Sequence, residues 1–88
     1  MNQIEAETLL MADVKLMKKI GEAARARVNV ERKRARGLRT SQAKATDLWH
    51  RAYGLATRLD QAVGDDYVVI REAFYRVYAA TLAAARVS

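Results

Sequence analysis

Apolar and polar residues recur along this 88-residue chain with the period of an α-helix. In the first third of the chain, apolar or small residues follow one another at intervals of four and three. This spacing places them on one helix face and leaves the opposite face polar. The inward stripe consists of Leu10, Val14, Met17, Gly21, Ala24 and Val28. The pattern predicts a first helix over residues 3–36.

Two later segments have the same period and predict helices over residues 41–63 and 66–86. Residues 67–70 are rich in β-branched side chains, so a short strand is the alternative there, but the helical spacing continues beyond them. The inward faces comprise Ala45, Leu48, Ala52, Leu55, Leu59 and Ala62 in the second segment, and Ile70, Ala73, Phe74, Val77, Thr81 and Ala84 in the third.

Glycines and capping residues mark the boundaries between these segments. Gly37 ends the arginine-rich part of the first segment and precedes Thr40 and Ser41, whose hydroxyls suit a helix N-cap. At the second boundary, residues 64–66 are a glycine followed by two aspartates, which favour a helix N-terminus. The chain contains no proline that would interrupt a helix interior.

The predicted fold is all-α, a three-helix bundle that forms one domain over residues 1–88. At about 1.5 Å per residue, the first helix would be about 50 Å long, against about 30–35 Å for the antiparallel second and third helices. Because each of the 17 alanines buries little area, we expect close helix packing to compensate. Gly21 and Ala24 would equally admit a second copy of the chain, so a homodimer through the first helix stays open.

The net charge of +6 is confined to one segment. Residues 25–44 contain eight basic residues and one acid, Glu31, and carry +7, while residues 1–24 sum to −1 and residues 45–88 to zero. The apolar face narrows in this segment and the chain turns back at Gly37. We therefore expect a thin basic hairpin tip between the first and second helices, of the kind that binds a polyanion or an acidic surface.

Part of this charge has a purely structural explanation. Cations in the last turn of a helix interact favourably with the helix dipole, which accounts for Lys33, Arg34 and Arg36. Other cations lie outside that turn, and an external anion would offset their mutual repulsion. These cations are Arg25, Arg27, Arg39 and Lys44. The candidate binding residues are Arg25, Arg27, Asn29, Arg32, Lys33, Arg34, Arg36, Arg39 and Lys44.

Duplex or structured nucleic acid is the favoured anion. Residues 25–44 contain no Phe, Tyr or Trp on which the bases of a single strand could stack. An arginine-dense helix can instead contact phosphates on both walls of a groove, and Asn29 could read an adenine edge. The segment is similar in composition to the arginine-rich helices of phage antiterminators and to the basic regions of zipper proteins. We expect contacts mainly to phosphates, with little sequence specificity.

The alternative is a protein partner. In this hypothesis the chain is a small inhibitor or adaptor from a mobile element such as a phage. Its basic surface docks on an acidic or nucleic-acid-binding groove of a specific host protein. Tyr75 falls away from the inward face of its helix and is the candidate aromatic contact for such a partner.

Catalysis, a cofactor and a metal site are not expected. The single histidine, His50, has Asp47 on its own helix, but Ser41 lies too far along that helix to complete a catalytic relay. The sequence lacks cysteine, a glycine-rich phosphate loop and carboxylates at metal-binding spacing. Charged residues interrupt every apolar run and nothing resembles a signal peptide, so we expect a cytoplasmic protein that does not bind membranes.

Overall fold

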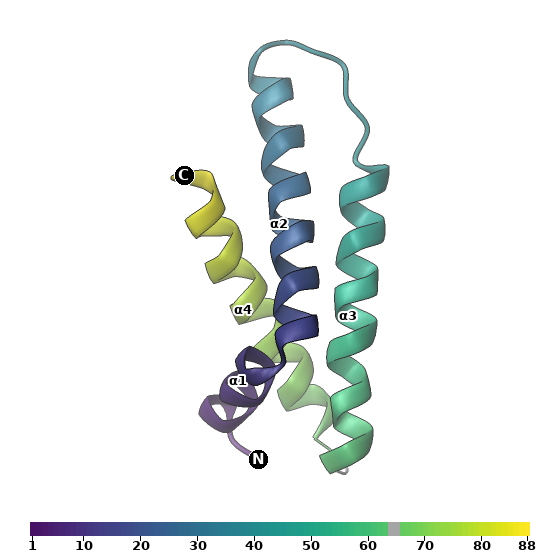
Figure 1. Cartoon of the computed structure of the whole chain (residues 1–88), viewed down its shortest axis with the longest axis vertical. Coiled ribbons are helices and arrows are strands. Elements are labelled where there is room, and N and C mark those ends of the chain that lie inside the picture. The colour runs from purple at the N-terminus through teal and green to yellow at the C-terminus, as the bar shows by residue number, and fades with distance from the viewer. Residues whose placement is uncertain (64–65) are drawn as a thin grey trace.

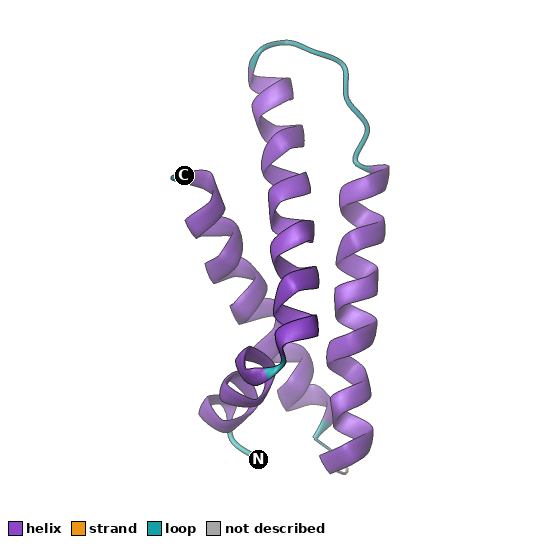
Figure 2. Cartoon of the chain, viewed as in Figure 1, coloured by secondary structure: helices purple, strands orange, loops and turns teal. Residues whose placement is uncertain are grey.

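The computed structural model describes residues 1–63 and 66–88, which contain four helices and no strand. α2 and α3 run antiparallel and side by side, and α4 returns from the end of α3 at a tilt (Figures 1 and 2). The all-α class is confirmed, whereas the prediction of three helices is wrong. The helices are α1 (Gln3–Ala12), α2 (Val14–Ala35), α3 (Ala43–Val63) and α4 (Tyr67–Arg86).

The predicted first helix is broken at Asp13. Its backbone is extended (φ −87°, ψ 103°), and its carboxylate accepts a hydrogen bond from Leu16 N at 2.9 Å, so Asp13 is the N-cap of α2. α1 therefore turns away from the axis of α2 and packs against α4 (Figure 1). Val14, expected on the inward stripe, is 83% exposed, because the buried stripe resumes after the break at Leu16 and Ile20.

The core lies where the four helices meet. Its largest fully buried side chains are Phe74, Leu10, Leu16, Ile20 and Ile70. Alanines without solvent exposure surround them and let the helix backbones approach closely, as the alanine-rich composition predicts. These alanines are Ala6, Ala52, Ala56 and Ala73.

At the opposite end of the molecule, the α2–α3 hairpin extends past the C-terminal end of α4 (Figure 1). The molecule is consequently elongated, with extents of 46 × 23 × 20 Å. α4 leans away from the hairpin, and Ala84, predicted to face inward, is exposed. We call the part of this hairpin formed by residues 25–44 the basic tip.

Gly37 ends α2 in a Schellman motif. Its φ is +76°, the left-handed conformation that favours glycine. Leu38 N donates to the carbonyl of Lys33 at 3.0 Å, and Gly37 N donates to the carbonyl of Arg34 at 2.9 Å. These two hydrogen bonds satisfy carbonyls that the helix end would leave open. The helix stop predicted at Gly37 is confirmed.

The starts of the later helices differ slightly from the prediction. α3 begins at Ala43, two residues beyond the predicted start, and Ser41 Oγ accepts a hydrogen bond from Ala43 N at 3.1 Å. Asp66 occupies the N-cap position of α4 but makes no capping hydrogen bond with its side chain. Gly64 and Asp65 lie outside the described residues. The helix prediction for residues 67–70 is confirmed, since they form the first turn of α4.

Gly37→Ala should lower the free energy of unfolding by about 1 kcal/mol, because a Cβ is strained at this positive φ. Gly54 is the matched control. It lies inside α3, and a Cβ added there would meet no atom within 4 Å. Gly54→Ala should therefore raise the free energy of unfolding by about 0.5–1 kcal/mol. Urea unfolding followed by circular dichroism measures both. If the free energy of unfolding changed in the same direction in both variants, this account of Gly37 would be contradicted.

Candidate functional site

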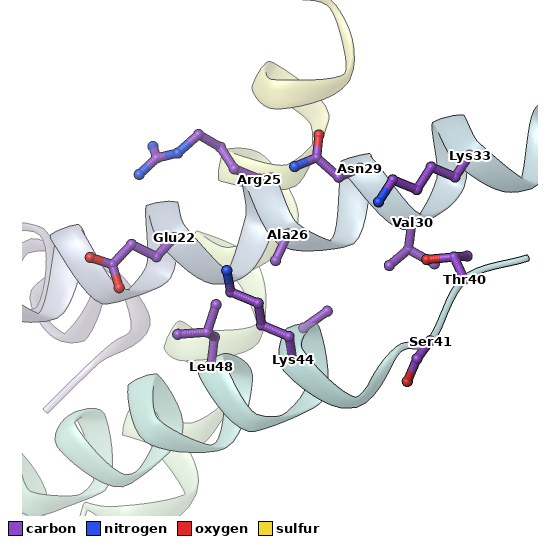
Figure 3. A pocket seen from close by; sticks show the side chains of 11 residues that line it. Glu22, Arg25, Ala26, Asn29, Val30, Lys33, Thr40, Ser41, Lys44 and Leu48 are labelled. Carbon is purple, nitrogen blue, oxygen red and sulfur yellow. The ribbon is translucent and has the colours of Figure 1, made fainter.

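A groove between α2 and α3 brings together four of the nine candidate residues. It encloses about 420 Å³ and runs along the side of the basic tip (Figure 3). Its floor is apolar, with Ala26 and Val30 from α2 and Leu48 from α3. The candidate residues that line it are Arg25, Asn29 and Lys33 on α2 and Lys44 on α3.

The two lysines come from opposite walls. In Figure 3 the side chain of Lys44 rises from α3 toward α2, and that of Lys33 extends along α2. The connection between the helices adds the hydroxyls of Thr40 and Ser41 at the tip end of the groove. Because Ser41 Oγ accepts its hydrogen bond from a backbone amide, its own hydrogen remains available to an anion.

The groove is a cationic site as a whole. Its lining contains three cations and one acid, Glu22, which lies at the end away from the tip. Cations and hydroxyl donors above an apolar floor suit a ligand that is both anionic and partly apolar.

The other five candidate residues lie outside this groove. Arg34 lies against Gln42, whose amide oxygen, when turned toward it, accepts from Nη1 at 2.7 Å and Nη2 at 3.2 Å. Arg32 donates to the main-chain oxygen of Ser88 at 2.8 Å. Arg36 and Arg39 are exposed at the end of α2 and in the connection that follows. The fifth residue, Arg27, belongs to an ion-pair cluster that faces α4.

Glu31 holds this cluster together. Arg86 of α4 donates to its two carboxylate oxygens at 2.9 and 2.7 Å, and Arg27 donates from one turn earlier at 3.3 Å. The hydrogen bonds from Arg86, followed by those from Arg27, lower the pKa of Glu31 from 4.5 to about 2. The one acid of the basic tip thus pairs with Arg27 and joins α2 to the end of α4.

Glu31→Gln should lower the free energy of unfolding at neutral pH by about 0.5–1 kcal/mol. The expected loss is modest because the carboxylate is 32% exposed and its ion pairs are screened by solvent. The folded pKa lies below the unfolded one, so the stabilisation is complete above about pH 4.5 and is lost as the pH falls toward about 2. Urea unfolding of the unaltered protein and of Glu31→Gln, measured as the pH falls through this range, should show that the difference between their free energies of unfolding decreases. A difference that stays constant with pH would contradict the assignment.

An aromatic cluster lies between α3 and α4, next to the basic tip. The ring centroids of Trp49 and Tyr53 are 5.2 Å apart, with 10° between the stacked planes. The ring of Tyr75 stacks with that of Trp49 at a centroid distance of 6.2 Å and an angle of 14°. Tyr75 is 45% exposed, which confirms its predicted position away from the inward face. The hydroxyl of Tyr53 is hydrogen-bonded to that of Tyr67, which together with burial raises the pKa of Tyr53 to about 12.

Some of these groupings had only weak signals in the sequence. The four-residue spacing of Trp49 and Tyr53 places them on one helix face, but their stacking with Tyr75 depends on how α4 packs. Thr40 and Ser41 have the residue types of helix caps, and only the fold places them in the groove. No local signal joins Glu31 to Arg86, since 55 residues separate them.

Comparison of the chain with protein-family models, with curated proteins and with solved structures gave no significant match. Among residues 1–63 and 66–88, no group of three His, Cys, Asp or Glu side chains could hold a metal ion. None of the helices in the described part of the chain combines the length and hydropathy that a membrane span requires.

Proposed function

We propose that this protein is a non-enzymatic nucleic-acid-binding protein that uses the basic tip to contact phosphates of duplex or structured nucleic acid. The observation that carries the proposal is the cationic groove, whose lining includes Arg25 and Lys33 from α2 and Lys44 from α3. Cations gathered around one space repel one another unless an anion joins them. Phosphate oxygens are the acceptors that arginine and lysine contact most often in nucleic-acid complexes.

The shape of the tip supports the same proposal. The end of the hairpin, after Arg32, projects beyond α4, so the cations there can approach a nucleic acid without obstruction from the rest of the bundle (Figure 1). The tip carries +7 while the remainder of the chain carries −1 in total. Such a separation of charge orients the protein during its approach to a polyanion.

A salt titration tests this proposal. Binding to a labelled DNA duplex and to a structured RNA is measured by fluorescence anisotropy at several salt concentrations. If about five to seven phosphates are contacted, log K should fall with log salt with a slope of about −4 to −6 on DNA. Sequence-scrambled duplexes should bind about equally well. No detectable affinity for either nucleic acid at about 50 mM salt would refute the proposal.

The aromatic cluster supports a second candidate function, a protein inhibitor or adaptor. Its exposed members, Tyr75 and Tyr67, resemble the aromatic anchors of protein interfaces. In this case the basic tip would dock on an acidic or nucleic-acid-binding groove of a host protein. Affinity capture from the source cells distinguishes the two functions. One stoichiometric protein that survives nuclease treatment and is lost with Tyr75→Ala would favour the inhibitor.

A further inference from the structure

We infer that the groove between α2 and α3 holds the sugar–phosphate backbone of one nucleic-acid strand, with Lys33 and Lys44 on opposite sides of that strand. This inference rests on the proposed function and makes it more specific. Charge on the tip alone would let a nucleic acid bind in many orientations. A backbone held in the groove has one path, parallel to α2.

The dimensions of the groove suit one strand. A volume of about 420 Å³ lies within the range of about 300–1,000 Å³ that is common for ligand sites, and it is far too small for a duplex to enter. Arg25 and Lys33 are eight residues apart on α2, a rise of about 12 Å. Successive phosphates of one strand lie farther apart along the backbone than their axial rise of about 3.4 Å, so this length spans at most about three phosphates.

The chemistry of the groove also follows that of a backbone. Arg25, Lys33 and Lys44 supply charge for the phosphate oxygens, and the hydroxyls of Thr40 and Ser41 can donate to further oxygens. The floor at Ala26 and its neighbours is apolar and suits the carbon atoms of the sugars. A free inorganic anion would use the cations but would gain nothing from the floor.

Two pairs of substitutions separate the groove from the rest of the tip. Lys33→Gln with Lys44→Gln removes two groove cations, and Arg36→Gln with Arg39→Gln removes two exposed cations outside the groove. At about 0.1 M salt, the groove pair should weaken binding to a DNA duplex about 50-fold and reduce the salt slope by about two. The other pair should weaken binding less than about fivefold. The thermal unfolding midpoints of both variants should match that of the unaltered protein.

A second test leaves the charge unchanged. Ala26→Phe fills the floor of the groove, whereas Ala35→Phe places the same ring on an exposed site near the end of α2 that does not line it. The first substitution should lower affinity about tenfold and the second should leave it unchanged. Circular dichroism should show the same helix content in both.

The possible failures are distinguishable. Equal losses from the two cation pairs, or equal affinities of the two phenylalanine variants, would overturn the groove assignment and leave nucleic-acid binding in place. Absence of binding by the unaltered protein at about 50 mM salt would overturn both. Stronger binding of an acidic peptide than of DNA, with the same loss in the groove pair, would also overturn the assignment and identify a protein surface as the ligand.

Discussion

Neutralising four cations of the basic tip should lower the affinity for duplex DNA by about 10³-fold at about 0.1 M salt. At this concentration each of the three groove cations contributes about eightfold, because log K falls by about 0.9 per phosphate contact for every tenfold rise in salt, and Arg36, outside the groove, contributes about twofold. The salt slope should become correspondingly shallower. Fluorescence anisotropy measures both quantities. The four substitutions are Arg25→Gln, Lys33→Gln, Arg36→Gln and Lys44→Gln.

The control for this prediction removes the same total charge elsewhere. Four cations outside the tip are exposed and can be neutralised in the same way. If position decides binding, this control should lose less than about tenfold in affinity. Equal losses in both variants would mean that only net charge matters and would contradict a localised interface. The control substitutions are Lys15→Gln, Lys18→Gln, Arg58→Gln and Arg76→Gln.

Phe74→Ala should lower the free energy of unfolding by about 3–5 kcal/mol. Phe74 is fully buried and packs edge-on against Trp49 at 5.5 Å and Tyr53 at 5.6 Å. An 88-residue domain has a total stability of about 4–13 kcal/mol, so the loss is a large part of it. In a thermal melt followed by circular dichroism, the midpoint should fall by about 12–40 °C.

Tyr75→Ala is the comparison for this substitution. Tyr75 belongs to the same aromatic cluster but is 45% exposed, and its ring stacks with that of Trp49 at a centroid distance of 6.2 Å. Such a pair contributes about 0.5–1.5 kcal/mol, so the melting midpoint should fall much less than in Phe74→Ala. Equal losses in the two variants would show that the core does not centre on Phe74.

The helices could be predicted from the sequence wherever a local signal coincides with the packing. Gly37 ends α2 because glycine adopts a positive φ without strain, and this preference depends on that residue alone. The break at Asp13 was not predicted, because the apolar spacing continues from Leu10 to Met17 through it. One capping hydrogen bond contributes only about 1 kcal/mol, and the packing of α1 on α4 then decides the break. That packing is a long-range effect, which periodicity does not encode.

The sequence predicts nine candidate residues, and the structure brings four of them into one groove. The basic tip could be located from the sequence, because the net charge of a segment follows from counting its residues. Whether a cation lines the groove or is paired depends on neighbours that are distant in sequence. Arg27 is paired with Glu31, and Arg86 shares the same carboxylate from the end of α4. Lys33 and Lys44 face a common space only because α3 folds back beside α2.

The basic tip lies outside the principal core, and its buried apolar residues are Val28 and Val30. Among the residues that the structure describes, this core is built from positions 6–20 and 52–77, on either side of the tip. Exposed side chains of the tip can therefore be exchanged at little cost to folding. Evolution could retarget such a protein by changing a few codons in one stretch of the gene. For protein engineering, the bundle is a scaffold on which a different recognition hairpin could be grafted while the core stays as it is.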